Sequence, residues 1–191
     1  INSVLLSTSY FPPIQYFKYF IISSYIYIEH KEYYKRHSMR NRTLILGPNN
    51  PLLLTVPIVN KHYSKTLVEN IKIANNAWKK KHINSIQTAY GSSPFFIYYF
   101  DEIKRIINQK NLFLIDLNYN ILNFFLQELE INSIIKKTDT YIKFYNSNIM
   151  DQRNEIEIFI VIFLFCFRTL ITSITSSVFS PHLFIPVFNL T

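Results

Sequence analysis

Hydrophobic residues in the first third of the chain come in short runs, which is the pattern of buried strands. Residues 3–8 form one apolar run, and residues 24–29 alternate Tyr with Ile. Both runs predict strands. Between them, Pro13 suits the first position of a helix over residues 14–23, because the N–H that proline lacks would be unpaired there.

Two further apolar runs, residues 43–46 and 51–59, flank a segment rich in turn-forming residues. That segment is Gly47-Pro-Asn-Asn-Pro51, so the two runs predict a β-hairpin. Residues 68–73 predict one more short strand. The first half of the chain therefore has the pattern of a sheet.

The spacing of apolar residues becomes helical after Asn76. The residues that share one face of the first predicted helix are Trp78, His82, Ile86 and Tyr90. Residues 96–107 and 114–129 predict two more amphipathic helices. Strands followed by helices indicate an α/β or α+β fold, with a mixed, sheet-centred N-terminal half and amphipathic helices packed on it.

The length of 191 residues suits one ordinary domain, and the aromatic fraction of 17% argues against wholesale disorder. The single cysteine, Cys166, excludes a disulfide framework and a cysteine-based zinc site, and we expect neither a metal nor a cofactor. The sequence contains no glycine-rich phosphate loop and no G-x-S-x-G nucleophile motif. The missing motifs argue against nucleotide-binding enzymes with a glycine-rich loop and against hydrolases with a nucleophile elbow, but they do not identify the class of this protein.

Positive charge is concentrated in residues 1–100, which hold 12 Lys and Arg against 3 Asp and Glu. Such a basic half favours an anionic partner, and we expect a small molecule that carries phosphate, such as a nucleotide-sugar. Nucleic acid is not expected, because only Tyr25 and Tyr27 resemble an aromatic strand platform. A solvated lysine-rich face is the alternative interpretation.

The segment over residues 29–42 is the richest in reactive side chains, with five basic residues, two acids and two histidines after a predicted strand. Arg40 and Arg42 are candidates to clamp a diphosphate, with Asn41 orienting a hydroxyl or amide. Glu29 and His30 are a candidate acid–base pair, since a nearby carboxylate raises the pKa of an imidazole toward neutrality. The alternative is a solvated loop of mixed charge.

His82 is the third catalytic candidate, because it lies on the inward face of its predicted helix, where it is either a proton-transfer group or a satisfied core histidine. Tyr10 and Tyr16 are candidates to form a platform for a sugar. Substrate contact is also expected of Tyr90.

Five segments of the chain, taken in order, resemble the WbqC-like family of bacterial proteins. They are residues 7–17, 29–34, 40–42, 78–82 and 90–96. The resemblance covers about residues 3–155 and implies a cytoplasmic protein, linked to surface polysaccharide and O-antigen gene clusters, that handles an activated or amino sugar. It supplies no reaction. Ser7-Thr8-Ser9 stands where many relatives have His-Gln-Pro, so no imidazole role is expected at that position.

Residues 159–191 contain one charged residue, Arg168. The uninterrupted apolar run over residues 158–167 is shorter than the roughly 20 residues of a membrane helix, so a membrane contact through residues 158–179 is not favoured. A buried helix or strand pair is another interpretation, and loss of the native reading frame near Glu157 is the favoured one. We therefore predict a WbqC-like domain over residues 1–155, with a clipped start, and an atypical tail over residues 156–191.

Two functions follow from the resemblance and the basic segment. The first is a transferase that modifies an activated amino sugar or related metabolite of surface polysaccharide biosynthesis. The second is a non-catalytic accessory module that binds nucleotide-sugars or partner enzymes of that pathway. A cleft in which residues 29–42, His82 and Tyr10 converge would favour catalysis, and a flat basic surface would favour binding.

Overall fold

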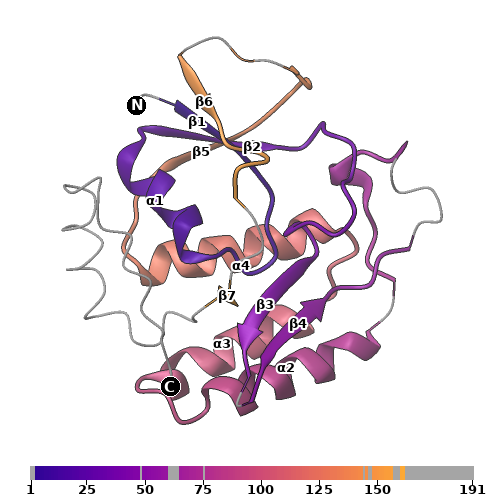
Figure 1. Ribbon diagram of the computed structural model, residues 1–191, viewed down its shortest axis with the longest axis vertical. Coiled ribbons are helices and arrows are strands. Elements are labelled where there is room, and N and C mark those ends of the chain that lie inside the picture. The colour runs from indigo at the N-terminus through magenta and orange to yellow at the C-terminus, as the bar shows by residue number, and fades with distance from the viewer. Residues whose placement is uncertain are drawn as a thin grey trace.

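The computed structural model describes residues 3–47, 49–59, 65–74, 76–143, 145, 148–156 and 160–161. It combines a four-stranded sheet, a three-stranded sheet and four α-helices in these described residues (Figure 1). In chain order the elements are β1 Ser3–Ser7, α1 Ile14–Ile22, β2 Tyr25–Glu29, β3 Arg42–Leu46, β4 Pro51–Thr55, the 3-10 helix η2 Val68–Asn70, α2 Ala77–Tyr90, α3 Phe96–Asn108, α4 Leu114–Glu128, β5 Ile134–Lys137, β6 Ile149–Asp151 and β7 Ile160–Val161. The mixed α/β class expected from the sequence is confirmed.

The larger sheet is parallel throughout and has the order β5-β2-β1-β6. Its central strands β1 and β2 are joined by α1, and they bury apolar side chains such as Val4, Leu6, Ile26 and Ile28. Strands covered on both faces are expected to read as such continuous apolar runs. The outer strands β5 and β6 come from the last third of the described chain, so the sheet unites both ends of the domain.

The smaller sheet contains the predicted hairpin, in which β3 and β4 are antiparallel, and β7 adds to β3 in parallel. At the turn, the Gly47 N–H donates to the Asn50 carbonyl over 3.2 Å. A Cβ at position 47 would lie 2.7 Å from that carbonyl oxygen, so only glycine fits without a shift.

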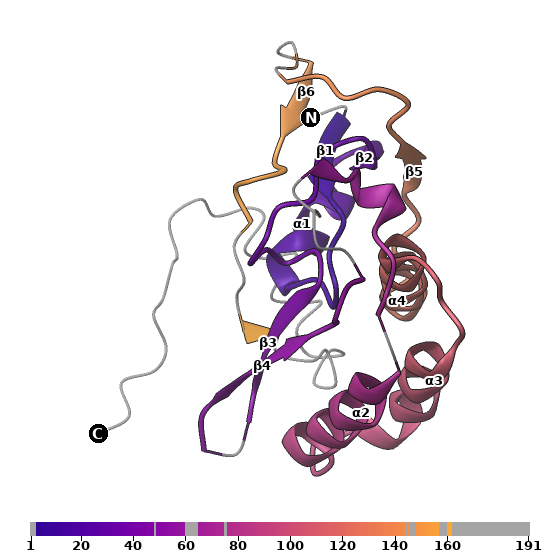
Figure 2. The ribbon, with the colours of Figure 1, turned by 90° about the vertical axis from the view of Figure 1, so that its right-hand side faces the viewer.

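The helices divide between the two sheets. Figures 1 and 2 show α1 and α4 against the larger sheet, and α2 and α3 at the opposite end of the molecule, near the hairpin. Helix α1 buries Tyr16, Phe17 and Phe20, and α4 buries Ile121, Phe125 and other apolar residues. One apolar core joins these layers.

The prediction of a strand over residues 68–73 is wrong. The chain forms η2 there and then single β-bridges at Lys72 and Ile73. The backbone N–H groups of Val68 and Glu69 donate to the carbonyls of Glu32 and His30, which hold the segment against the loop after β2. These contacts replace the ladder that a strand would need.

Within the part of the chain that the structure describes, no helix has the length and hydropathy of a membrane span. The tail predicted over residues 156–191, and with it the membrane contact considered for residues 158–179, lies outside the described residues, except for Ile156 and the backbone of β7.

Candidate functional site

The four parallel strands of the larger sheet end at one edge, and polar side chains follow each of them. Ser7 closes β1, Glu29 closes β2, Thr138 follows β5 and Arg153 follows β6. The chain runs from β1 to β2 on one side, while β6 pairs with β1 on the other, so the strand order reverses at β1. Ligands of open α/β sheets bind beyond the carboxyl ends of strands at such a point.

Glu29 is fully buried at this edge, and protein groups satisfy its carboxylate. Its oxygens accept hydrogen bonds from the Thr138 hydroxyl at 2.6 Å and the Lys31 N–H at 2.9 Å. The Arg153 guanidinium forms an ion pair with it at 2.9 Å and also binds Asp151. Glu29 therefore joins β2 to the end of β6.

The His30 ring hydrogen-bonds through Nε2 to the Tyr119 hydroxyl at 2.9 Å. Burial, together with the charge of Lys137, lowers the pKa of His30 to about 4, and the opposing effects of Glu69 and Glu29 are smaller. Glu29 raises the pKa of His30, as expected, but burial outweighs this effect of a carboxylate that Arg153 already neutralises, so the pKa of His30 lies well below neutrality.

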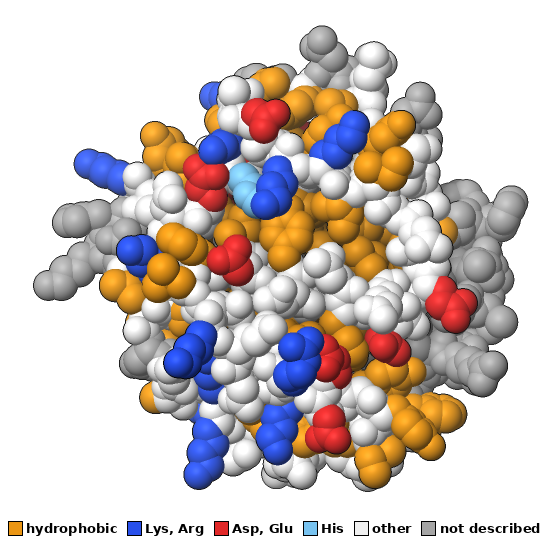
Figure 3. Space-filling model, turned by 180° about the vertical axis from the view of Figure 1, so that it is seen from behind, with side chains coloured by type: hydrophobic (Ala, Val, Ile, Leu, Met, Phe, Trp, Pro, Cys, Tyr) orange, Lys and Arg blue, Asp and Glu red, His pale blue; other side chains and the backbone are white. Residues whose placement is uncertain are grey.

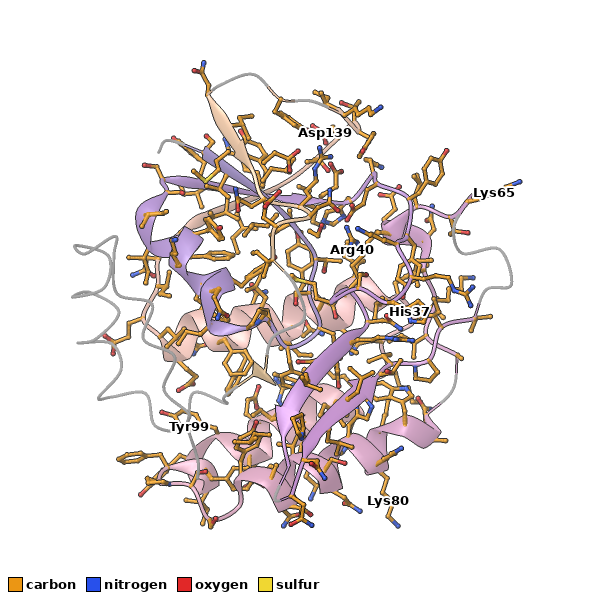
Figure 4. The ribbon with its side chains drawn as sticks, in the orientation of Figure 1. His37, Arg40, Lys65, Lys80, Tyr99 and Asp139 are labelled. Carbon is orange, nitrogen blue, oxygen red and sulfur yellow. The ribbon has the colours of Figure 1, made fainter. Side chains whose placement is uncertain are left out.

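Arg40 lies in the interior between the larger sheet and the hairpin (Figure 4). Its guanidinium donates to the Glu32 carboxylate through Nε at 2.8 Å and to the Ser7 hydroxyl at 2.7 Å. Ser7 in turn donates to the Arg153 carbonyl at 2.9 Å. Arg40 thus links the loop after β2 to the ends of β1 and β6.

A narrow crevice lies beside this network and is too small to hold a water molecule. Its lining includes Thr8, Ser9, Tyr16, Asn118 and Tyr119. The Tyr16 hydroxyl donates to the Ser7 carbonyl at 2.8 Å, and burial raises the pKa of Tyr16. Two polar atoms of the lining, Ser9 Oγ and Asn118 Oδ1, are buried without a hydrogen-bond partner.

Tyr10 and His82 form a second buried histidine–tyrosine pair. The Tyr10 hydroxyl lies 2.8 Å from His82 Nδ1, and the His82 ring packs edge-on against Trp78. Burial lowers the pKa of His82 to about 4, although a hydrogen bond with the Thr55 backbone partly offsets it. The ring is therefore neutral at pH 7.

A basic cleft of about 280 Å³ lies on the other side of Thr55. Arg36, His37, Asn41 and Arg42 line it, and none of its lining residues in the described chain is acidic. Arg42 Nε is buried and has no hydrogen-bond partner. The Asn41 amide accepts from the Tyr34 hydroxyl at 2.6 Å and donates to the Val56 carbonyl at 2.9 Å, which fixes the cleft wall.

The structure therefore brings Asn41 and Arg42 together on one cleft and places Tyr10 and His82 behind its wall. Glu29, His30 and Tyr16 gather instead at the edge of the larger sheet. The Tyr90 hydroxyl accepts from the Leu46 N–H at 3.1 Å near the hairpin turn. Tyr90 does not line the basic cleft.

A comparison with protein families places most of this chain in one of them. The model of the WbqC-like protein family matches residues 8–161. The chain belongs to the WbqC-like family. Searches of curated proteins and of solved structures found no match. The matched range of this WbqC-like chain contains every predicted site residue and ends with β7.

Several residues of the two regions described above were not predicted from the sequence. Glu32 and His37 lie inside the basic segment over residues 29–42. The high content of charged residues and histidines in this segment was the feature of the sequence that could have identified them. Tyr119 comes from α4, whereas Thr138 and Arg153 follow β5 and β6, and their places depend on the pairing of these strands with β2 and β1. No group of three or more His, Cys, Asp or Glu that could hold a metal ion occurs among the described residues.

Proposed function

We propose that this WbqC-like chain is a cytoplasmic, transferase-type enzyme that modifies an activated amino sugar, or a related phosphate-bearing metabolite, in surface polysaccharide biosynthesis. The observation that carries the proposal is the basic cleft, because its lining combines Arg36, His37 and Arg42 with no acidic side chain among the described residues. The same substrate class is what the resemblance to WbqC-like proteins implies.

Arg42 is the residue that we assign to the phosphate. Its Nε is a buried donor without a partner, and a phosphate oxygen would satisfy it. A planar guanidinium can bind two phosphate oxygens at once, and its neighbours Arg36 and His37 add positive potential when His37 is protonated. In this proposal Arg40 keeps its structural partners Glu32 and Ser7, so the two arginines do not share one ligand.

Asn41 and the Tyr10–His82 pair act in this proposal as positioning groups. The Asn41 amide joins Tyr34 to Val56 in the cleft wall. His82 bonds to the backbone of Thr55, which also lines the cleft. The proton-transfer roles predicted for Glu29, His30 and His82 remain predictions, and His37 is the histidine that lines the cleft.

The first test is the binding of nucleotide-sugars to the full chain by isothermal titration calorimetry, with UDP-N-acetylglucosamine as the first probe and other UDP-, dTDP- and GDP-sugars after it. Arg42→Lys keeps the charge and loses the fork, so affinity should fall at least about tenfold, the effect of a charge-assisted hydrogen bond. Arg105→Lys, on the exposed face of α3, is the matched control and should bind normally. Equal affinity in Arg42→Lys and wild type would contradict the proposal.

A non-catalytic accessory module is the second candidate, and a specific observation favours it. Neither His30 nor His82 lines the basic cleft, and the pKa of each lies near 4 instead of near neutrality. Mass spectrometry of a bound nucleotide-sugar, incubated with the protein and a panel of acyl and aminoacyl donors, separates the candidates. An enzyme produces a heavier sugar nucleotide that Arg42→Ala fails to make, whereas a module binds its ligand and returns it unchanged.

A further inference from the structure

A second cleft lies between α3 and α4, remote in sequence from the basic segment. Its volume of about 350 Å³ falls within the range of small-molecule sites. Figure 2 shows α3 and α4 as neighbours, with α4 nearer the larger sheet and α3 nearer the hairpin end of the molecule. The function proposed above makes no use of this cleft.

Four side-chain amides dominate the lining of this cleft. They belong to Gln109, Asn120, Asn123 and Gln127. Each amide carries a carbonyl acceptor and an NH₂ donor, which is the same pair of capacities that a sugar hydroxyl presents. A ligand with several neighbouring hydroxyls can therefore bind those halves of the amides that are not already engaged within the protein.

Two of these amides are already oriented by their neighbours. Asn120 Nδ2 donates to Gln109 Oε1 at 3.0 Å and to Asn111 Oδ1 at 3.2 Å. The Nδ2 atom of Asn111 is buried and has no hydrogen-bond partner. Asn111 is not among the residues that line the cleft, whereas Asn123 and Gln127 line it and are exposed on α4.

The charges of the lining select against a phosphate. Glu102 accepts a hydrogen bond from Arg105 at 2.7 Å, so the arginine of the cleft is already paired. Glu128 adds a carboxylate on the α4 side, which repels an anionic ligand. The apolar members of the lining, Ile106 and Phe124, are buried and offer little surface to an apolar ligand.

The geometry points to a binding site for a neutral saccharide in the α3/α4 cleft, separate from the basic cleft. Hydroxyl groups of the sugar bind the amides of Asn120, Asn123 and Gln127, and the Glu128 carboxylate accepts a hydrogen bond from a further hydroxyl. The site requires no phosphate on its ligand, and this distinguishes its ligand from an activated sugar.

The test is nuclear magnetic resonance of the full chain labelled with ¹⁵N, because the side-chain NH₂ groups of Asn and Gln give their own signals. The probes are three neutral trisaccharides: maltotriose, cellotriose and N,N′,N″-triacetylchitotriose. We expect at least one of them, at millimolar concentration, to shift the NH₂ signals of Asn120, Asn123 and Gln127.

The double variant Asn123→Ala/Gln127→Ala should weaken this binding about tenfold, since it removes two hydrogen-bonding groups and places a good helix former at exposed positions. Asn84→Ala, at an exposed position of α2, is the matched control and should bind normally. Arg42→Lys should also bind the trisaccharide normally. This variant therefore distinguishes a failure of the function proposed for the basic cleft from a failure of the saccharide site proposed here. The absence of shifts with all three probes, or equal affinity in the double variant, would overturn the proposal.

Discussion

His30 and His82 are built alike, each with its ring against a tyrosine hydroxyl and each with a pKa lowered to about 4 mainly by burial. At pH 7 both rings are neutral and act as hydrogen-bond partners. A general acid or base is most effective when its pKa lies near the working pH. A proton-transfer role for either ring therefore requires a ligand that raises this pKa.

The neutral state of His82 predicts how stability depends on pH. The unfolded chain protonates this ring near pH 6.5 and the folded chain only near pH 4, so the unfolded state binds more protons between these values. Stability should be fully present above pH 6.5 and fall as the pH drops to about 4, by at most about 3 kcal/mol for this ring. Urea unfolding at a series of pH values measures the effect.

In His82→Gln the loss of stability between pH 6.5 and pH 4 should be smaller than in wild type, and stability at pH 7 should already be lower by about 1 to 3 kcal/mol. His37→Gln, at an exposed position, is the control and should keep the wild-type profile. Identical profiles in His82→Gln and wild type would contradict a buried, neutral His82.

Single residues show where sequence analysis of the site reached its limit. The helical spacing that placed His82 and Trp78 on one inward face was sufficient, because that face is local to α2. The pairing of Glu29 with His30 was inferred from adjacency, but successive residues at the end of a strand point in opposite directions. Glu29 meets Arg153 and His30 meets Tyr119, partners that no local pattern names.

At the scale of elements, the buried ion pair between Glu29 and Arg153 fastens β6 to the sheet. β6 is three residues long, and its backbone pairs only with β1 among the described strands. The side chains of Glu29 and Arg153 are 0% and 4% exposed. Removing one member of such a pair leaves a buried charge without compensation, which costs about 3 to 5 kcal/mol.

We therefore expect Arg153→Met alone to lower the free energy of unfolding by about 3 to 5 kcal/mol, and Glu29→Leu/Arg153→Met to lose less than the sum of the two single variants. Denaturant unfolding of the four proteins measures the coupling. Arg105→Met, which breaks an exposed pair on α3, should melt like wild type. Additive losses in the double variant would mean that the pair has no energetic coupling.

The elements that sequence patterns predicted well are those whose signal is local. The helices over 77–90, 96–108 and 114–128 follow their apolar spacing, and the hairpin follows its turn residues. β5 and β6 escaped prediction because they are short and largely or partly exposed, so their burial pattern has no strong period. Whether such segments become strands depends on the edges that β2 and β1 offer them.

At the scale of the whole molecule, the excess of basic residues in the first 100 positions of the sequence can be followed on the folded surface. Figure 3 shows a face on which basic side chains alternate with acidic and hydrophobic ones. The basic cleft gathers Arg36, His37 and Arg42 in one place. The net charge of the sequence favours an anionic partner, and the fold determines where the basic residues of the proposed phosphate site lie.

The extent of the folded unit gives a prediction for truncated chains. Ile156 is buried, β7 pairs with β3, and the family match ends at residue 161. A chain that ends after Val161 should therefore melt at the temperature of the full chain, whereas one that ends after Asn154 should melt several degrees lower, because it lacks Ile156 and β7.

Circular dichroism melts of the full chain and both truncated chains make the comparison. A lower melting temperature in the chain that ends after Val161 would show that residues 162–191 stabilise the fold. It would also count against the loss of reading frame predicted near Glu157.

The pairing of residue 3 with residue 149 also sets an order of events during synthesis. β1, α1 and β2 are synthesised before β5 and β6, so both outer edges of the β1–β2 pair stay open until residues 134–151 have been made. Open, apolar strand edges recruit other chains. Closing a sheet between the two ends of a domain is slow, because the intervening chain must be ordered first. The nascent chain, in which β1 and β2 still lack their partners β6 and β5, is therefore the form of this protein that is most prone to aggregation.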